Sequence, residues 1–243
     1  RRSSFDITGL PPTPKELADF EADNSPQAYE KVVDRLLTSK HFGERMALYW
    51  LDVVRFADTA GYHSDNHRDL APYRDYVIDA FNNNKPFDEF TIEQLAGDLL
   101  PNATGEQRIA SGYNRLLQTT EEGGAQAKDY EQRMLTDRVR AVGNAWIGQT
   151  TGCCQCHDHK FDPIPTADYY SLYGVFASCV EPTIPPLFED TPQTQAYVDF
   201  AKELTERERK LAEYLDQKFR ELVDGSRTRV AEYLMAAHEL QGK

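Results

Sequence analysis

The sequence predicts a mainly α-helical fold. Apolar residues recur every three or four positions through most of the chain, which is the period of an amphipathic helix. Two of these segments open on Thr-Pro or Ser-Pro, where the hydroxyl residue caps the helix and proline takes its first position. No segment shows the strict alternation that indicates a half-buried strand. We therefore expect an irregular helical domain with long loops, followed by a C-terminal helical hairpin.

Three helices are expected in the first part of the chain. A proline-rich loop leads into a helix that begins at Thr13-Pro14. Ser25-Pro26 opens a second helix, Gln27 to Ser39. The third, His41 to Ala57, is apolar on much of its circumference, so we expect it to lie centrally.

Two polar loops divide the middle of the chain, Asp58 to Leu70 and Thr119 to Ala127. Loops on a rigid scaffold are where functional residues concentrate, so both are candidate site segments. Three helices are expected between them: Pro72 to Asn83, Phe87 to Leu100 and Gly105 to Leu117.

A long helix, Lys128 to Gly148, then leads into a cysteine-rich loop, and a short aromatic helix follows at Thr166 to Ala177. We expect one domain over residues 1–180. Residues 181–243 should form a proline-rich linker and the hairpin, whose two helices, Asp199 to Val223 and Arg227 to Leu240, are separated by the helix breaker Gly225.

Composition narrows the classes of function. The 243 residues carry a formal net charge of −13, which argues against nucleic acid, where a basic surface is expected. An acidic surface suits solubility, and also docking of a basic redox partner. No run approaches the ~20 apolar residues of a membrane helix, so no span is expected in this chain.

The stretch that carries chemistry is C-x-x-C-H, formed by Cys153, Cys156 and His157. This is the attachment signature of c-type haem. Two thiols three residues apart can each add to one vinyl group at a haem edge. The histidine that follows is then held under the iron as its proximal ligand.

Three other readings of the same residues stay open. Cys153, Cys156, His157 and His159 offer four zinc ligands, although structural zinc sites usually draw ligand pairs from separated segments. A redox dithiol would need a βαβ context, and the flanking segments are predicted to be helical. A disulfide, for example between Cys154 and Cys179, is the third.

The chain also resembles a known family. The resemblance rests on GCCQCHDHKFDP around the motif and on DITGLPPTP, EQLAGDLLPNAT, TTEEGGAQ and DRVR elsewhere, and it extends over residues 1–180. It also includes Ala57 to Asp65 and Tyr73 to Phe81. The family occurs in large planctomycete proteins alongside cytochrome c-like domains, and is described as planctomycete cytochrome-type. One departure is Cys154, where the family more often has alanine.

The resemblance implies a haem-binding redox domain of an exported multidomain protein, periplasmic or on the cell surface. It would serve electron transfer or a haem-dependent oxidation, in a setting of polysaccharide degradation. If it is an enzyme, it is a haem c-dependent oxidoreductase. Because the chain opens inside the family pattern, we expect it to be a piece of a longer protein, with other domains or subunits as partners. The alternative is a non-catalytic structural or binding module in which the Cys/His cluster holds zinc or a disulfide.

Several residues are candidates for roles beside the haem. His63 is the first candidate for the sixth iron ligand and Met134 the second. Arg138 and Arg140 suit the haem propionates, because guanidinium matches carboxylate geometry. They would equally pair with acidic neighbours on their own helix.

Two further hypotheses concern acidic residues. Glu121 and Glu122 are candidates for a general acid or base. Oxygen ligands for calcium would come from Asp58, Asp65, Asp158 and Asp162. We expect the two polar loops and the loop from Cys153 to Asp162 to converge on one site.

Overall fold

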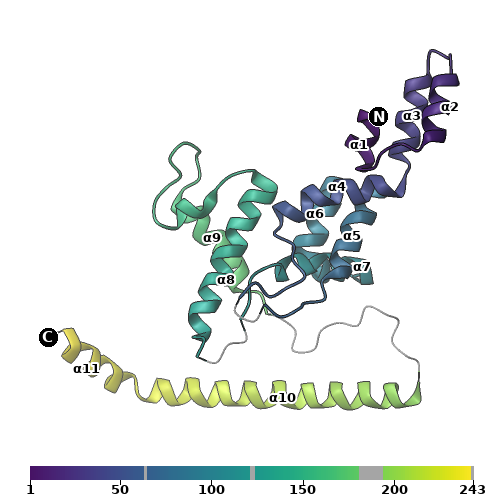
Figure 1. The fold of residues 1–243 in the computed structure, drawn as a ribbon. Coiled ribbons are helices and arrows are strands. Elements are labelled where there is room, and N and C mark those ends of the chain that lie inside the picture. The colour runs from purple at the N-terminus through teal and green to yellow at the C-terminus, as the bar shows by residue number, and fades with distance from the viewer. Residues whose placement is uncertain (63–64, 121–123, 181–193, 242–243) are drawn as a thin grey trace. The chain divides into compact units, whose positions relative to one another are not determined.

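The computed structural model describes residues 1–62, 65–120, 124–180 and 194–241 (Figure 1). These residues form eleven α-helices joined by loops and short 3-10 or π turns, and their only β pairing is two isolated bridges. The predicted mainly α fold is therefore confirmed. The chain divides into two compact units, Arg1–Phe188 and Glu189–Lys243. Among the described helices, none combines the length and hydrophobicity that a membrane span needs.

Three of the four N-terminal helices follow the predicted order, whereas the first, Arg2–Thr8, was not predicted. The fourth ends at Val53, four residues before the predicted Ala57, and one cap also differs. The bounds are α1 (Arg2–Thr8), α2 (Pro14–Ala22), α3 (Ala28–Leu37) and α4 (Lys40–Val53). Thr13 and Glu16 form a reciprocal capping box at α2, as its start signal predicts. The cap predicted at Ser25 is wrong. Gln27 is the N-cap residue of α3, and the Ser25 amide donates instead to the Asp23 carboxylate at 2.9 Å.

Helix α4, which was predicted to lie centrally, is buried on one face only. Gly43 and Ala47 are buried against α5, whereas Leu48, Tyr49 and Val53 are 57%, 55% and 43% exposed. The Gly43 amide donates to the Asn82 side chain at 2.8 Å. A Cβ at Gly43 would collide with the backbone of α5, so this glycine permits the close approach of the two helices.

The middle helices end earlier than their apolar pattern predicts. They are α5 (Ala71–Asn82), α6 (Phe87–Ala96) and α7 (Gly105–Ala110). The residues predicted to form the last α-helical turns of these two helices instead form 3-10 turns, Gly97–Leu99 and Ser111–Arg115. Thr104 and Gln107 form a second capping box at α7.

A buried polar side chain, Gln94 of α6, joins these helices. Its Oε1 accepts from Trp50 Nε1 at 2.9 Å and from Tyr73 Oη at 2.5 Å, while its Nε2 donates to the Phe90 carbonyl at 3.1 Å. Gln94 is 0% exposed, so every one of these bonds is made away from water. Satisfied in this way, a buried amide fixes the orientation of its neighbours instead of destabilising the core.

The long helix predicted after the second loop is α8 (Ala127–Val142), continued by a π turn, Gly143–Ile147, and ended by Gly148 in the left-handed region with φ 66°. Trp146 of the π turn packs edge-on against Trp50 and Tyr113, with ring centroids 5.4 and 4.8 Å apart. Its Nε1 donates to Thr91 Oγ1 at 3.0 Å. The helix α9 (Thr166–Ala177) has the predicted bounds.

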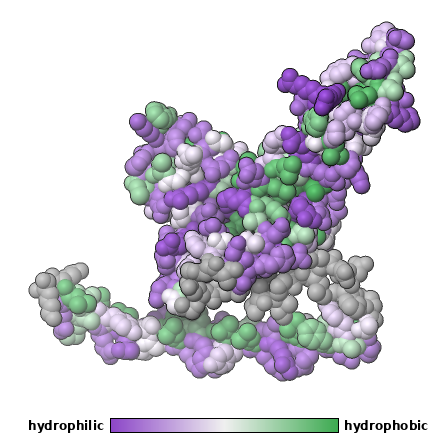
Figure 2. All heavy atoms as spheres, in the orientation of Figure 1, coloured by the Kyte–Doolittle hydropathy of each residue, from purple (hydrophilic) through white to green (hydrophobic). Residues whose placement is uncertain are grey.

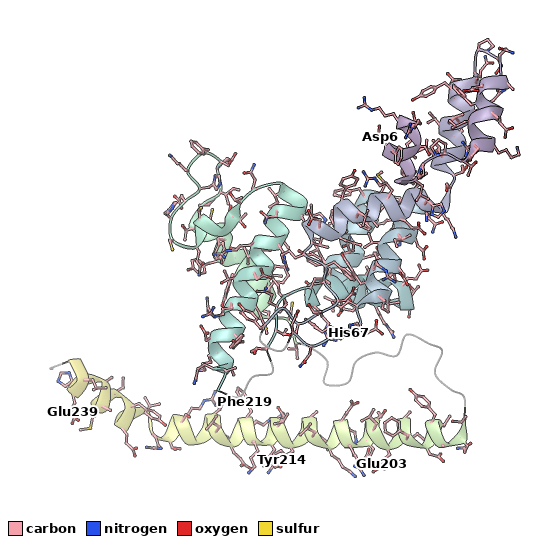
Figure 3. All side chains as sticks on the ribbon, in the orientation of Figure 1. Asp6, His67, Glu203, Tyr214, Phe219 and Glu239 are labelled. Atoms are coloured by element: carbon pink, nitrogen blue, oxygen red, sulfur yellow. The ribbon has the colours of Figure 1, made fainter. Side chains whose placement is uncertain are left out.

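The second unit corrects the expected hairpin. Helix α10 (Gln195–Thr228) runs through Gly225 and has Arg229 as its C-cap, and α11 (Val230–Gln241) continues away from it without folding back (Figure 1). Phe200, Leu211 and Phe219 are more than half exposed, and Figures 2 and 3 show apolar side chains projecting along α10. One glycine costs a helix only about 1 kcal/mol relative to alanine, so a 34-residue helix tolerates it.

The charge of Glu93, beside Gln94, gives a testable pH dependence. Burial alone would raise its pKa, but hydrogen bonds from Lys85, Tyr76 and Gln107 outweigh burial and lower it. The stability that ionised Glu93 contributes is therefore present above its usual pKa of 4.5 and lost as the pH falls through the lowered folded value.

We predict that Glu93→Gln lowers the free energy of unfolding by about 1–3 kcal/mol at pH 7, because it leaves Lys85 without its charged partner. The difference in the free energy of unfolding between the variant and the wild-type protein should become smaller as the pH falls below 4.5. Urea unfolding at several pH values measures it. A difference that is constant from pH 7 to pH 3 would contradict this account.

Candidate functional site

The cysteine motif begins on a 3-10 turn, Thr151–Gln155, held between α8 and α9, and Cys156 and His157 follow this turn directly. Thr151 is buried, and its hydroxyl donates to the Val139 carbonyl of α8 at 3.3 Å. On the other side, Tyr170 Oη of α9 donates to the Gln155 carbonyl at 3.0 Å. Both helices therefore fix the turn that presents the motif.

The three residues of C-x-x-C-H are all exposed. The amides of Cys156 and His157 both donate to the Cys153 carbonyl, at 3.2 and 3.3 Å, which winds the motif into one helical turn. His157 Nδ1 lies 2.8 Å from the Asp158 carbonyl. A carbonyl only accepts, so Nδ1 is the donor, and in the neutral imidazole the lone pair is then on Nε2.

The fourth residue of this stretch, Cys154, faces the opposite way. It is 0% exposed, its Sγ lies 3.5 Å from the Ile164 carbonyl, and burial raises the pKa of its thiol. Cys179 is exposed, and all four cysteines are free thiols in this structure. The disulfide considered between Cys154 and Cys179 is not formed.

His159 orders the loop that follows the motif. Its side chain is 10% exposed, and its Nδ1 lies within hydrogen-bonding distance of the backbone amides of Phe161 and Asp162, at 3.4 and 3.1 Å. Asp158 accepts from the Thr166 amide at 2.8 Å and so caps α9. In the described part of the chain, no group of three or more His, Cys, Asp or Glu side chains is arranged to hold a metal ion.

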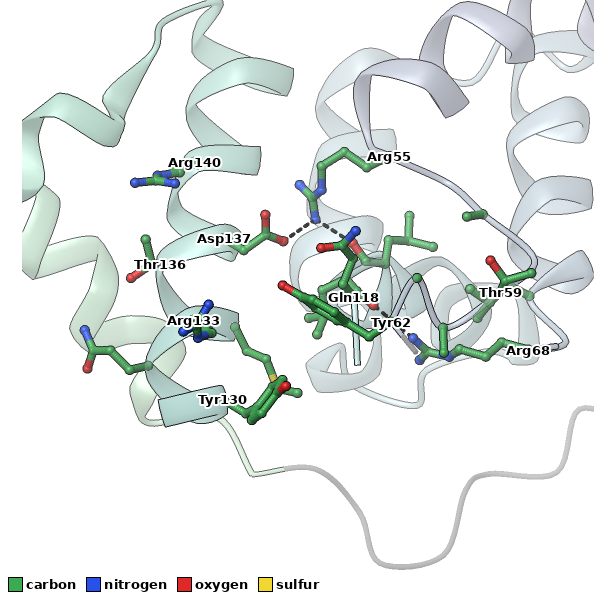
Figure 4. A pocket seen from close by; sticks show the side chains of 18 of the residues that line it. Arg55, Thr59, Tyr62, Arg68, Gln118, Tyr130, Arg133, Thr136, Asp137 and Arg140 are labelled. Carbon is green, nitrogen blue, oxygen red and sulfur yellow. Dashed lines mark hydrogen bonds and ion pairs between the residues drawn. The ribbon is translucent and has the colours of Figure 1, made fainter. Parts of the chain in front are cut away.

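A pocket of about 690 Å³ opens between α8, the first polar loop and residues 116–118 (Figure 4). We call it the basic pocket, because its described lining includes four arginines and a single carboxylate. Those five residues are Arg55, Arg68, Arg133, Arg140 and Asp137. Aromatic and amide side chains complete the lining at Tyr62, Tyr130, Gln118, Gln132 and Gln155.

An ion pair closes the inner wall of the basic pocket. Arg55 adopts a left-handed backbone with φ 62° just after α4, and its Nη2 lies 2.9 Å from Asp137 Oδ2 of α8. It also donates to the Leu116 carbonyl (Figure 4). Burial raises the pKa of Asp137 despite the opposing charges of Arg55, Arg140 and Arg138.

The expected convergence of three loops is shown in part. Gly61 and Thr119 form an isolated bridge, so the two polar loops meet, and the first of them borders the basic pocket. The cysteine loop contributes Gln155 to that pocket. Cys153, Cys156 and His157 are not among its lining residues.

Arg140 lies at the junction of pocket and motif, because a Cβ at Gly152 would come 2.8 Å from its Nε. Arg138 instead donates from Nε to the Asn114 carbonyl at 3.0 Å. Met134 lines the basic pocket and is partly buried.

His63, Glu121 and Glu122 lie outside the described residues, so their predicted roles stay predictions. The carboxylates proposed for calcium do not form a cluster in the described chain. Asp65 accepts from the Gly61 amide at 2.8 Å, and its pKa is lowered by hydrogen bonds from Thr59 and Gly61.

Sequence reasoning missed most of the basic pocket. The part of the pocket on α8 could have been predicted from the sequence. Its residues recur at intervals of three or four and so lie on one side of a helix: Tyr130, Arg133, Asp137 and Arg140. Arg55 and Arg68 carried no such signal. Their place depends on contacts with the carbonyls of residues 115–117, far along the chain.

A comparison with protein families gives one result. Residues 1–181 match the model of PSCyt2, described as a protein of unknown function (DUF1549). Neither the comparison with curated proteins nor that with solved structures found a match.

Gly143 of the π turn offers a test of how the motif is positioned. A Cβ there would lie 2.5 Å from Thr151 Oγ1 and 2.9 Å from the Gln149 carbonyl. We predict that Gly143→Ala lowers the free energy of unfolding by about 1–3 kcal/mol through overpacking. Gly174→Ala in α9, where a Cβ meets nothing within 4 Å, should instead raise it by about 0.5–1 kcal/mol. Thermal or urea unfolding compares them, and equal effects would contradict the packing described.

Thiol labelling tests the opposite orientations of the cysteines. In haem-free, reduced protein, iodoacetamide should modify Cys153, Cys156 and Cys179 rapidly and Cys154 slowly, because only Cys154 is buried. Peptide mass spectrometry over a time course gives each rate. Labelling of Cys154 as fast as that of Cys153 would show that the turn does not bury it.

Proposed function

We propose that this chain, which belongs to the PSCyt2 family of proteins of unknown function, is an exported redox domain that binds one c-type haem covalently. The observation that carries the proposal is the donor set on a single turn. Two exposed thiols and an exposed imidazole follow one another, while the extra cysteine is buried. Cys153 and Cys156 would form the thioethers, and His157 would bind the iron.

The orientation of His157 supports its role as ligand. A metal-binding histidine commonly donates its second ring nitrogen to a carbonyl or carboxylate, which fixes the tautomer and the ring plane. His157 Nδ1 makes this bond to the Asp158 carbonyl at 2.8 Å. Asp158 in turn caps α9, so the ligand is attached to a helix and not to a loose loop.

Arg140 is the better of the two candidate partners for a haem propionate. It is exposed, and it lies against Gly152, one residue before Cys153. Arg138 is already bonded to the Asn114 carbonyl. A guanidinium beside a propionate would neutralise its charge and hold the cofactor edge.

When bound, haem supplies one-electron chemistry, and the protein adjusts it through the axial ligands and their surroundings. The chain's own residues would attach the cofactor and hold His157 in one tautomer. Whether the domain only transfers electrons or also oxidises a substrate depends on the sixth position. His63, outside the described residues, stays the sequence-based candidate for that position.

Export follows from the same proposal, because c-type haem is attached outside the cytoplasm. A redox partner and further domains of a larger protein would complete the system. The alternative, a structural module built on zinc or a disulfide, receives no support from the described residues, whose thiols are free and whose Cys/His groups do not converge.

A pyridine haemochrome spectrum tests the proposal. We predict a c-type α-band for protein produced with the haem-attachment machinery, and haem that stays with the polypeptide through acid–acetone extraction. The double variant Cys153→Ser/Cys156→Ser should lose covalent haem entirely, because both thioether sulfurs are gone. Cys154→Ser and Cys179→Ser are the matched controls and should keep it.

Two results would contradict the proposal. One is an unmodified polypeptide mass together with stoichiometric zinc, which would establish the structural alternative. The other is haem that remains covalent in the double variant, which would assign the attachment to a different pair of cysteines.

A further inference from the structure

The charge of the basic pocket is opposite in sign to the net charge of the chain. The protein carries a net −13, yet the described lining of this pocket has four arginines and one aspartate. Asp137 is paired with Arg55, and Arg133 and Arg140 add further positive charge to the described lining. A concave site of one sign in a protein of the opposite sign attracts and concentrates a ligand of complementary charge.

Arg133 is the lining arginine that lies one helical turn from Tyr130 on α8, so it can contact a ligand that lies against that ring. Among the described residues its ion pair is with Asp129, through Nε at 2.8 Å, on the exposed surface of α8. Neither Nη group takes part in that contact. Guanidinium groups bind carboxylates with paired, parallel hydrogen bonds, so a carboxylate is the anion that fits this position.

The remaining lining suits a hydroxylated ring. Tyr62 and Tyr130 meet edge to face, with centroids 6.1 Å apart and an interplanar angle of 86°, and so present an aromatic corner (Figure 4). Gln118, Gln132 and Gln155 contribute amides, which both donate and accept and therefore match hydroxyl groups. The volume of about 690 Å³ is that of a small-molecule site.

We propose that the basic pocket binds a sugar acid, with the carboxylate on Arg133, the ring against Tyr62 and Tyr130, and the hydroxyls on the glutamine amides. The inference goes beyond haem attachment and does not depend on it, because none of the three C-x-x-C-H residues lines the pocket. The charge, the aromatic corner and the amides all belong to one concave surface of the first unit.

Isothermal titration calorimetry of the full chain with D-glucuronate and D-glucose tests this proposal. We expect saturable binding of glucuronate and affinity for glucose that is lower by about tenfold or more, because glucose lacks the charged group. Acetate should be at least as weak as glucose, because it lacks the ring and hydroxyls.

Two variants locate the site. Arg133→Gln and Tyr130→Ala should each weaken glucuronate binding by about tenfold, the factor expected for loss of one charge-assisted hydrogen bond or one stacking surface. Arg207→Gln is the matched control. Arg207 makes the same Nε contact of 2.8 Å with a carboxylate four residues earlier, but on α10.

Equal binding of glucose and glucuronate would overturn the assignment of an acid, and equal binding of acetate would overturn the assignment of a sugar. Unchanged affinity in both pocket variants would remove the ligand from this pocket. Haem content is read separately from its visible absorbance. Failure of sugar binding is thereby distinguished from failure of haem attachment.

Discussion

The arrangement of the first unit depends on the buried amide of Gln94. It holds the Trp50 indole of α4 and the Tyr73 hydroxyl of α5 on one helix, α6. Trp50 then provides the surface against which Trp146 packs, at the end of α8. Trp146 lies five residues before Thr151, where the cysteine turn begins. A hydrogen bond in the core thus sets the position of the candidate haem site.

Helix α8 carries two different functional surfaces. At its C-terminal end, the π turn and Gly143 allow Thr151 to approach α8, and the turn that follows exposes Cys153 and Cys156 while burying Cys154. Along its middle, α8 faces the first polar loop and residues 116–118 and forms one wall of the basic pocket. Arg140 is common to both surfaces. A ligand in the pocket and a cofactor on the turn would therefore both lie near Arg140.

Local signals in the sequence predicted local structure well. The Thr13-Pro14 signal predicted the start of α2, and the aromatic pattern predicted the bounds of α9. The predictions were wrong where interactions with other residues outweighed a weak local preference. Gly225 was expected to break a helix, but ion pairs such as Arg209 with Glu206 and Glu213 stabilise α10 across many turns. The basic pocket needed contacts between residues about sixty positions apart, which no local pattern encodes.

The central claim is that the exposed pair of cysteines, and not the buried one, carries the haem. Trypsin should release residues 141–160 as one peptide, since Arg140 and Lys160 are the flanking cleavage sites. Tandem mass spectrometry of that peptide from haem-loaded protein locates each modified sulfur. The account predicts one haem attached at Cys153 and Cys156, with Cys154 a free thiol. A peptide without haem, or one with a thioether at Cys154, would contradict it.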